Sequence, residues 1–260
     1  MIRFFEDPID VAEFRNLRNF VFAPVLPSTN QAGRGWIDYA DREEVAVAPL
    51  AICALEQTEG RGRRDRTWRS PRGGLYLTFV WKVPPGSSLS HLPLAAAVWA
   101  AEACSRAFGL SVGLKWPNDL LFSGKKLGGI LTEARTRGEE THAAVGFGVN
   151  VLDNLELTKD AGATAAARES GRPASIGSAF LELCREFDRY LDRPDTGSVV
   201  EDWKSRAVHR AGDQIRILLD PENPESCVDG AFDGVTEEGF LRLRTATGEK
   251  VVTSGEVRSW

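Results

Sequence analysis

Apolar side chains along the chain recur at helical spacing in some segments and form short apolar runs typical of strands in others, and each change of pattern marks an expected helix or strand. Residues 8–20 place apolar side chains at every third position, which predicts a short helix. Residues 45–56 are largely apolar and predict a buried strand, and residues 75–82, LYLTFVWK, predict a second strand rich in aromatic and β-branched side chains. A buried helix is then expected from about Ser88 or Ser90 to Phe108, because serines suit helix starts and apolar positions recur at helical spacing.

The second half of the chain continues the alternation and then becomes purely strand-like. Short strands joined by turns are expected at residues 111–135 and 142–151, and a polar surface excursion at residues 152–173. Two helices are expected after it, at residues 176–191 and 199–207. From Gly212 onward, short apolar runs are separated by Asp-Gly, Glu-Gly and Thr-Gly pairs, which predicts a small β-barrel-like domain. We therefore expect two domains, 1–211 and 212–260.

Composition narrows the class of protein. The 260 residues are 42% hydrophobic and carry a net charge of -5, so the chain can bury one large core, and attraction of its whole surface to nucleic acid is unfavourable. Its four cysteines are widely spaced without a CxxC pair, which favours buried reduced thiols and no zinc site. The amino terminus lacks the basic start of a signal peptide and no run of 18 apolar residues occurs, so a cytoplasmic location without membrane contact is expected.

Residues 57–74, QTEGRGRRDRTWRSPRGG, form the most unusual stretch, which we call the arginine loop. Its six arginines and four glycines predict a mobile surface loop, because each guanidinium needs water or an anion. Guanidinium groups bind carboxylate and phosphate oxygens in pairs, and glycine lets the backbone approach a ligand. A solvated basic loop or a nucleic-acid-binding patch remains an alternative.

Two further segments carry candidate chemistry. In GLKWPNDLLFSGKKLGGILTEA, residues 113–134, Lys126 precedes Gly128 and Gly129, so its ammonium group could lie along a bound ligand and stabilise developing negative charge. The alternative is a hairpin with exposed lysines at its tip. The polar triplet at residues 28–30 favours a turn or a helix cap.

Taken together, these motifs resemble those of the biotin protein ligases. GRGRRDRTWRSPRGGLYLT and KWPNDLLFSGKKLGGILTE occur in this order, with STNQ at 28–31 upstream and GFGVN at 146–150 and GEV at 255–257 downstream. The resemblance covers nearly the whole chain from about Pro27. It implies an α+β fold, with a class II synthetase-like mixed sheet and helices, followed by a small SH3-like β-barrel. With STNQ so near the start, it also implies a ligase without the DNA-binding winged-helix domain of the repressor members.

The resemblance implies a two-step reaction and a set of site residues. Biotin and ATP, with Mg²⁺, would give biotinyl-5′-AMP, from which biotin passes to a lysine of a carboxylase carrier domain. Catalytic roles fall on Lys126, Arg63 and Asp119. Biotin-binding positions are Ser28, Thr29, Gln57, Gly60, Arg61, Gly62, Arg63, Lys126 and Gly129. Nucleotide-binding positions are Arg64, Arg66, Trp68, Asn118 and Asn150. No protein-bound metal site is expected.

One position departs from the family pattern, and several alternatives stay open. The family usually has glycine where this loop has Asp65, which could pair with a neighbouring arginine or repel phosphate. A lipoate-type ligase or acyltransferase of related fold is the alternative enzyme. A non-catalytic biotin-binding or nucleic-acid-binding protein is the alternative outside enzymes. The resemblance also admits a homodimer, and no DNA partner is expected.

Overall fold

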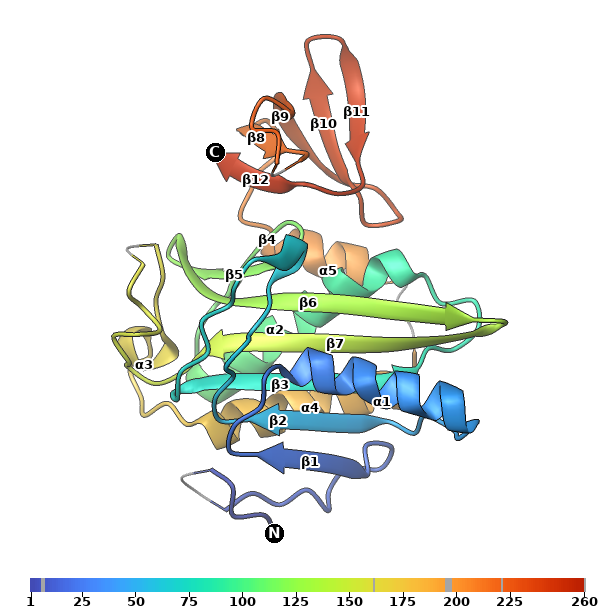
Figure 1. The fold of residues 1–260 in the computed structure, drawn as a ribbon. Helices are drawn as coiled ribbons and strands as arrows, with labels where there is room; N and C mark the ends of the chain where they lie inside the picture. Colours follow the sequence, from blue (N-terminus) through green and yellow to red (C-terminus); the bar gives the residue numbers. More distant parts are fainter. Residues whose placement is uncertain (6–7, 161, 195–197, 221, 260) are drawn as a thin grey trace.

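A seven-stranded mixed sheet forms the centre of the molecule (Figure 1). The computed structural model describes residues 1–5, 8–160, 162–194, 198–220 and 222–259. The strands of this sheet are Asn19–Ala23 (β1), Leu50–Ala54 (β2), Gly74–Lys82 (β3), Gly113–Lys115 (β4), Asp119–Phe122 (β5), Lys125–Arg137 (β6) and Glu140–Asn150 (β7). Their spatial order is β1-β2-β3-β7-β6-β5-β4, in which only β1 and β2 run parallel to each other.

Helices cover both faces of this sheet. In Figure 1, α2 (Leu92–Phe108) and α4 (Ile176–Asp192) lie behind it, while α1 (Thr29–Glu43) lies in front. The rings of Phe79 on β3 and Phe187 on α4 stack with centroids 4.1 Å apart, in the main core. The shorter helical segments are Arg63–Asp65 (η1), Leu89–His91 (η2), Ala166–Glu169 (α3) and Val199–Arg206 (α5).

On the opposite face, α1 packs closely because it contains glycine where it meets the sheet. Ile37 and Ala40 of α1 are buried in a separate small cluster with Val80 of β3. A Cβ atom at Gly33 would lie 2.9 Å from Cγ2 of Val80, closer than real Cβ contacts allow. Gly33 therefore sets how closely α1 approaches β3, and so where the start of the helix lies.

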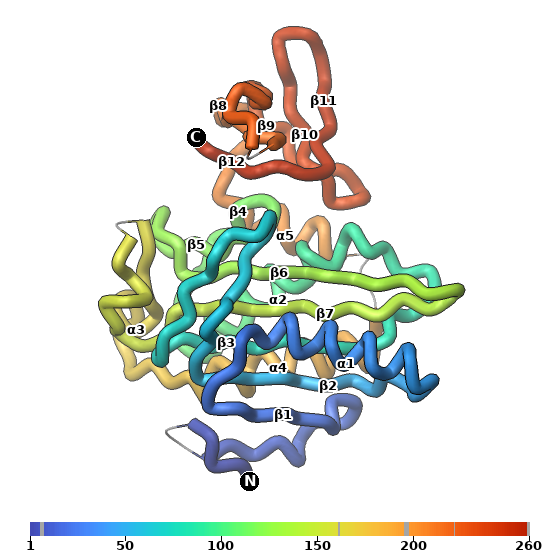
Figure 2. The backbone as a smooth tube through the Cα atoms, viewed as in Figure 1, coloured from blue at the N-terminus to red at the C-terminus, as the bar shows by residue number. Residues whose placement is uncertain are grey.

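A second, antiparallel sheet of five strands lies beyond β4 and α5 (Figures 1 and 2). Its order is β11-β10-β9-β8-β12, and the strands are Gln214–Leu218 (β8), Cys227–Val235 (β9), Leu241–Thr245 (β10), Gly248–Val252 (β11) and Glu256–Ser259 (β12). Ile217, Leu243 and Val257 are buried inside it. The predicted α+β class and the small carboxy-terminal β domain are confirmed. The division at residue 211 stays a prediction.

The predicted helix at residues 8–20 is wrong. This segment is irregular until β1 begins, because its backbone is held by a residue far away in the sequence. The Asp188 carboxylate on α4 accepts hydrogen bonds from the backbone N–H groups of Arg15, Asn16 and Leu17, at 3.1, 2.8 and 2.8 Å. A carboxylate that binds three successive N–H groups fixes an open turn that helix hydrogen bonds would compete with.

The remaining expectations for local structure hold more closely. Ser28 is the N-cap of α1, and its hydroxyl accepts a hydrogen bond from the N–H of Gln31 at 3.4 Å, although the helix beyond it was not predicted. Ser175 caps α4 as expected, and the strand predicted at 45–56 is confined to β2. All four cysteines are free thiols, and burial raises the pKa of Cys104 to about 12. No helix within the described ranges is long and apolar enough to cross a membrane.

Candidate active site

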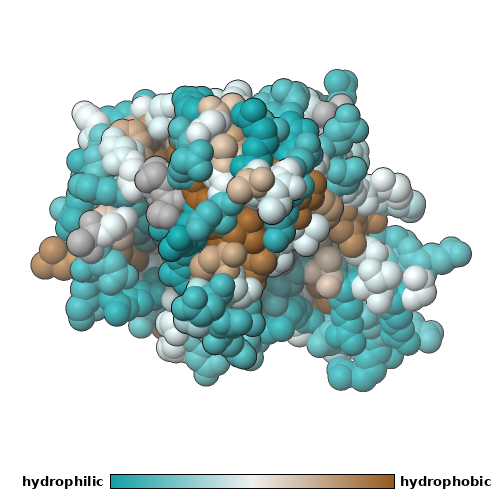
Figure 3. Space-filling model, turned by 90° about the horizontal axis from the view of Figure 1, so that it is seen from above, coloured by the Kyte–Doolittle hydropathy of each residue, from teal (hydrophilic) through white to brown (hydrophobic). Residues whose placement is uncertain are grey.

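A cavity of about 420 Å³ lies between the start of α1, the arginine loop and strands β6 and β7. Figure 3 views the molecule from above, where hydrophilic side chains cover most of the visible face and hydrophobic ones gather towards its centre. Of the residues predicted for the site, all but Gly60 and Arg64 line the cavity. These are Ser28, Thr29, Gln57, Arg61, Gly62, Arg63, Arg66, Trp68, Asn118, Asp119, Lys126, Gly129 and Asn150.

Glycines on the two central strands make the floor of the cavity. Gly129 of β6 and Gly148 of β7 are direct partners in the antiparallel ladder. The indole of Trp68, from the arginine loop, rests on this floor, so a Cβ atom at Gly148 would lie 2.4 Å from its Nε1. That Nε1 is buried and has no hydrogen-bond partner within the described part of the chain. The floor is therefore flat enough for a planar group, and the Trp68 indole lies on it.

The polar end of the cavity joins the start of α1 to the arginine loop. The backbone N–H of Thr29 donates to Oε1 of Gln57 at 2.7 Å, and Nε2 of Gln57 donates to Oγ of Ser70 at 2.8 Å. Ser28, Thr29 and Ser70 are buried, with 3%, 3% and 4% of their surface exposed. Polar groups this well buried and bonded are held in fixed positions, which suits recognition of a small polar head group.

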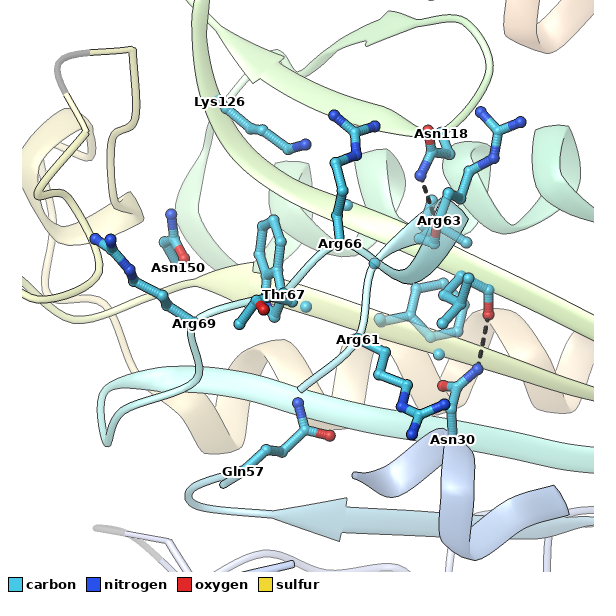
Figure 4. Close-up of a pocket in the computed structure, with 18 of the residues that line it drawn as sticks. Asn30, Gln57, Arg61, Arg63, Arg66, Thr67, Arg69, Asn118, Lys126 and Asn150 are labelled. Carbon is cyan, nitrogen blue, oxygen red and sulfur yellow. Dashed lines mark hydrogen bonds between the residues drawn. The ribbon is translucent and has the colours of Figure 1, made fainter. Parts of the chain in front are cut away.

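At the other end, a lysine and a carboxylate lie beside the indole. Nζ of Lys126 is 2.6 Å from Oδ1 of Asp119 and 5.3 Å from the centre of the Trp68 ring. Nδ2 of Asn118 donates to the carbonyl oxygen of Ile130 at 2.7 Å, which fixes the turn before β5. Figure 4 shows the side chains of Lys126 and Arg66 extending over the same part of the cavity. The cavity is thus polar at one end and cationic at the other.

The arginine loop is anchored to the carboxy-terminal domain, whereas the sequence predicts a mobile surface loop. Three of its guanidinium groups donate to acceptors in the last part of the chain. These contacts are Arg63 to the carbonyl of Gly255 at 3.2 Å, Arg64 to the carbonyl of Leu219 at 2.7 Å and Arg66 to the carboxylate of Glu256 at 2.8 Å. The smaller domain therefore helps to fix the position of the loop over the cavity.

Gly60 and Arg64 lie outside the cavity lining for different reasons. A Cβ atom at Gly60 would lie 2.3 Å from the carbonyl oxygen of Trp68, so this glycine lets the loop close on itself. Arg64 points to the carboxy-terminal domain, where it also contacts Oγ of Ser254 at 3.3 Å. The predicted roles of Gly60 in biotin binding and Arg64 in nucleotide binding stay predictions.

Burial and crowding of cations shape the electrostatics of the cavity. Burial lowers the pKa of Arg63, and repulsion from Arg64 and Arg66 lowers it further. Burial also lowers the pKa of Lys115, which precedes the turn at the cationic end. A cation whose charged form is disfavoured by its surroundings gains most from an arriving anion. The site is therefore prepared for carboxylate or phosphate groups.

Asp65 has a structural explanation in its backbone. Arg64 and Asp65 both have positive φ angles of 56°, in the left-handed region that glycine favours. Among non-glycine residues, aspartate and asparagine adopt this conformation most readily. The turn that glycine usually makes in this family can thus be made by Asp65. No ion pair of Asp65 within 4 Å is found among the described residues, so the predicted pairing with an arginine is not seen.

Several residues that line the cavity were not predicted. Asn30 follows two predicted positions in STNQ, and its 5% exposure shows how fully it is buried. Glu156 and Asp160 come from the excursion after β7, which approaches the site because the N–H of Lys126 donates to the carbonyl of Gly162 at 2.6 Å. Asn30 had a signal in the motif. The two carboxylates had none, because only tertiary contacts bring their segment to the cavity.

A resident metal site is not supported by the side chains. Within the described ranges, no group of three or more histidine, cysteine, aspartate or glutamate side chains is placed to hold a metal ion. Asp119 lines the cationic end of the cavity, and it is already paired with Lys126. One carboxylate suits a Mg²⁺ ion that arrives with phosphate ligands of its own, because this ion commonly binds through one or two carboxylates and substrate phosphates.

Comparisons with known proteins agree with the geometry. The model of the biotin/lipoate A/B protein ligase family matches residues 22–150, and the model of the biotin protein ligase carboxy-terminal domain matches residues 212–258. A biotin--[acetyl-CoA-carboxylase] ligase of Paracoccus denitrificans is 34% identical over 85% of this chain and 96% of its own length. The chain belongs to the biotin protein ligase family.

Other members of this family resemble the chain over most of its length. The bifunctional ligase/repressor BirA of Bacillus subtilis is 29% identical over 92% of this chain and 74% of its own. Among solved structures, the biotin protein ligase of Aquifex aeolicus in complex with biotin and ATP is 27% identical. It superposes with a TM-score of 0.71 and covers 93% of this chain and 98% of its own. The chain is thus an enzyme of the ligase class, with the fold of that family in both domains.

Proposed function

We propose that this biotin protein ligase joins biotin and ATP into biotinyl-5′-AMP in the cavity and then transfers biotin to a lysine of a carboxylase carrier domain. The single observation that carries the proposal is the arrangement of one cavity, polar at the Thr29 end and cationic at the Lys126 end, under one loop. The carboxylase acceptor is supported by the name of the Paracoccus relative, and the two substrates by the Aquifex complex.

In the first step, a carboxylate oxygen of biotin attacks the α-phosphorus of ATP, and pyrophosphate leaves with the electron pair of the broken P–O bond. Two anions must approach each other, so cations at the reaction centre lower the barrier most. Lys126 is our candidate for the group beside both anions, with Arg63 and Arg66 as further cations. Mg²⁺ would supply additional charge neutralisation at the phosphates, and Asp119 is the side chain that would help to hold it.

In the second step, the amine of the acceptor lysine attacks the acyl carbon, AMP leaves and the amine loses a proton. The mixed anhydride must be kept from water until the acceptor arrives. We assign this protection to the arginine loop and to Trp68, whose indole already rests on the cavity floor. Asn118 and Asn150, which donate to the carbonyls of Ile130 and Thr164, are proposed to hold the nucleotide side of the cavity in shape.

The test is label transfer from biotin to a purified carrier domain in the presence of ATP and Mg²⁺. We expect one lysine of the carrier to be labelled, and formation of biotinyl-5′-AMP before the carrier is added. A chain that makes neither adenylate nor labelled carrier would overturn the proposal. Competition between biotin and lipoate in a binding titration separates this function from that of the lipoate ligases, which share the matching family model.

Two neighbouring lysines make a matched pair of variants for the role of Lys126. Lys126→Ala should slow single-turnover adenylate formation by at least about 100-fold, the usual cost of removing one group that stabilises charge at the reacting atoms. Lys125→Ala removes the same charge from the exposed tip of the β5–β6 turn and should change the rate by less than about twofold. Equal rates in the two variants would remove Lys126 from its assigned position.

A further inference from the structure

Behind the polar end of the cavity lies a chain of hydrogen bonds that the proposed reaction does not use directly. It connects Glu133 of β6, Asn30 at the start of α1, Thr78 of β3 and Thr29, and we call it the polar relay. Asn30, Thr78 and Thr29 are buried, with 5%, 0% and 3% of their surface exposed. A Cβ atom at Gly146 would lie 1.7 Å from Oδ1 of Asn30, so the sheet leaves room for this side chain by having glycine there.

The directions of the hydrogen bonds that Asn30 makes follow from which atoms can donate. The Asn30 amide faces the carbonyl of Leu131 at 3.1 Å and the carboxylate of Glu133 at 2.9 Å, both of which only accept. These contacts must therefore come from the amide nitrogen, and Oδ1 faces the hydroxyl of Thr78 at 2.8 Å. The Thr78 hydroxyl, with its single proton, faces two acceptors, Oδ1 of Asn30 and Oγ1 of Thr29.

Two side-chain contacts orient the hydroxyl of Thr29. Its hydroxyl lies 2.8 Å from Oγ1 of Thr78 and 3.1 Å from Oε1 of Gln57. The Thr29 hydroxyl donates to Oε1 of Gln57, which also accepts the backbone N–H of Thr29. The Thr29 proton is therefore engaged by Gln57, and the contact with Thr78 holds the Thr29 oxygen in place. The Thr29 oxygen therefore offers only lone pairs to the cavity.

Gln57 offers the cavity a hydrogen-bond donor, whereas Thr29 offers an acceptor. Its Nε2 donates one hydrogen to Ser70, whose own hydroxyl donates to the carbonyl of Trp68 at 3.0 Å. The second Nε2 hydrogen remains for a ligand, and Gln57 lines the cavity. This wall thus presents one acceptor and one donor. A cyclic urea carries the complementary pair, an N–H group and a carbonyl oxygen.

We propose that Asn30 and Thr78, anchored by Glu133, are positioning residues that hold the Thr29 hydroxyl in the orientation in which its oxygen accepts from the ureido ring of biotin. The inference rests on the proposed function, because it takes biotin as the occupant. Glu133 contributes an acceptor that turns the Asn30 amide in one direction, and it is itself 3.4 Å from Nη1 of Arg34. None of the three need touch the reacting atoms.

The decisive variant is Thr78→Val, which keeps the β-branched shape on β3 and removes only the hydroxyl. Asn30 Oδ1 then loses its donor and the Thr29 hydroxyl keeps only its contact with Gln57, so the dissociation constant for biotin should rise about tenfold. The KM for ATP and kcat at saturating biotin should stay within about twofold. Thr132→Val is the matched control on β6, since the Thr132 hydroxyl is buried without a hydrogen-bond partner among the described residues. It should bind biotin as the unaltered chain does.

Ligand analogues separate polarity from simple packing damage. Two cyclic carbamate analogues of biotin, each with one ureido N–H replaced by oxygen, are titrated calorimetrically into both chains. Thr78→Val should weaken the binding of biotin about tenfold. It should weaken the binding of the analogue that lacks the N–H facing Thr29 by less than about threefold, because this analogue cannot donate to Thr29 in either chain. An equal loss for biotin and both analogues, or no loss for biotin, would overturn the relay.

Glu133 gives a second route that does not depend on a buried substitution. Glu133→Ala should weaken biotin binding about threefold, and Glu133→Gln should restore it because the amide oxygen still accepts from Asn30. If Glu133→Ala binds biotin normally, Glu133 is no anchor. If the unaltered chain fails to bind biotin at all, the proposed function fails first, and the relay loses its ligand with it.

Discussion

The contact between Arg66 and Glu256 gives the sharpest prediction, because it couples the two domains across the site. The two side chains meet at 2.8 Å, with the Glu256 side chain 20% exposed and that of Arg66 51% exposed. Glu256→Gln keeps the shape and an acceptor oxygen but removes the charge. At this exposure the loss is about 1 kcal/mol. That corresponds to about fivefold in the equilibrium between the anchored and the released arginine loop.

Trypsin measures this release directly, because it cleaves after arginine and the loop contains six. When opening is fast compared with cleavage, the initial rate of cutting follows the open population. Glu256→Gln should therefore be cut in the loop about five times faster, as followed by mass spectrometry. Asp229→Asn is the matched control, since it breaks the exposed Arg216–Asp229 pair in the same small domain without touching the loop. Equal cleavage rates for Glu256→Gln and the unaltered chain would refute the anchoring role.

Three further predictions follow from the geometry. Gly148→Ala should push Trp68 off the cavity floor, since the added Cβ would lie 2.4 Å from its Nε1. Calorimetry should show biotin binding weakened at least about tenfold, with little change in the unfolding midpoint. Burial lowers the pKa of His209 to about 4, below its unfolded value near 6.5. The unfolded chain therefore binds a proton that the folded chain does not, and the free energy of unfolding should fall by about 2 kcal/mol between pH 7 and pH 5. In urea titrations, His209→Phe should remove this part of the pH dependence. Asp65→Gly should keep biotin affinity within about twofold, whereas Asp65→Val should weaken it, because only the latter resists a positive φ.

Much of the fold was predictable where local signals agree with the tertiary structure. The strand at residues 75–82 and the helix capped by Ser175 both carry a strong pattern of apolar side chains, and both occur. The amino-terminal segment was not predictable, because the Asp188 carboxylate that holds its backbone lies more than 170 residues away. Helix α1 was missed because its two glycines and few apolar side chains give a weak helical signal, while Gly33 is needed for close packing on β3.

The candidate site was predictable to the extent that motifs mark it. Ladder pairing brings Gly129 beside Gly148, so two motifs that are separate in the sequence meet on one floor. The destination of Arg64 could not be foreseen, because its acceptor, the carbonyl of Leu219, lies 155 residues further along the chain. The motif marked Asn30, but its contact with Glu133 could not be foreseen, since the two residues are 103 positions apart.

The anchoring of the arginine loop has a consequence for folding during synthesis of the chain. Arg63 and Arg66 are separated from their acceptors, Gly255 and Glu256, by 192 and 190 residues. Since a ribosome delivers the chain from its amino terminus, every strand of the larger sheet is made before these acceptors exist. A nascent chain can therefore assemble the floor and walls of the cavity, but its cover is secured only after the carboxy-terminal domain has been made.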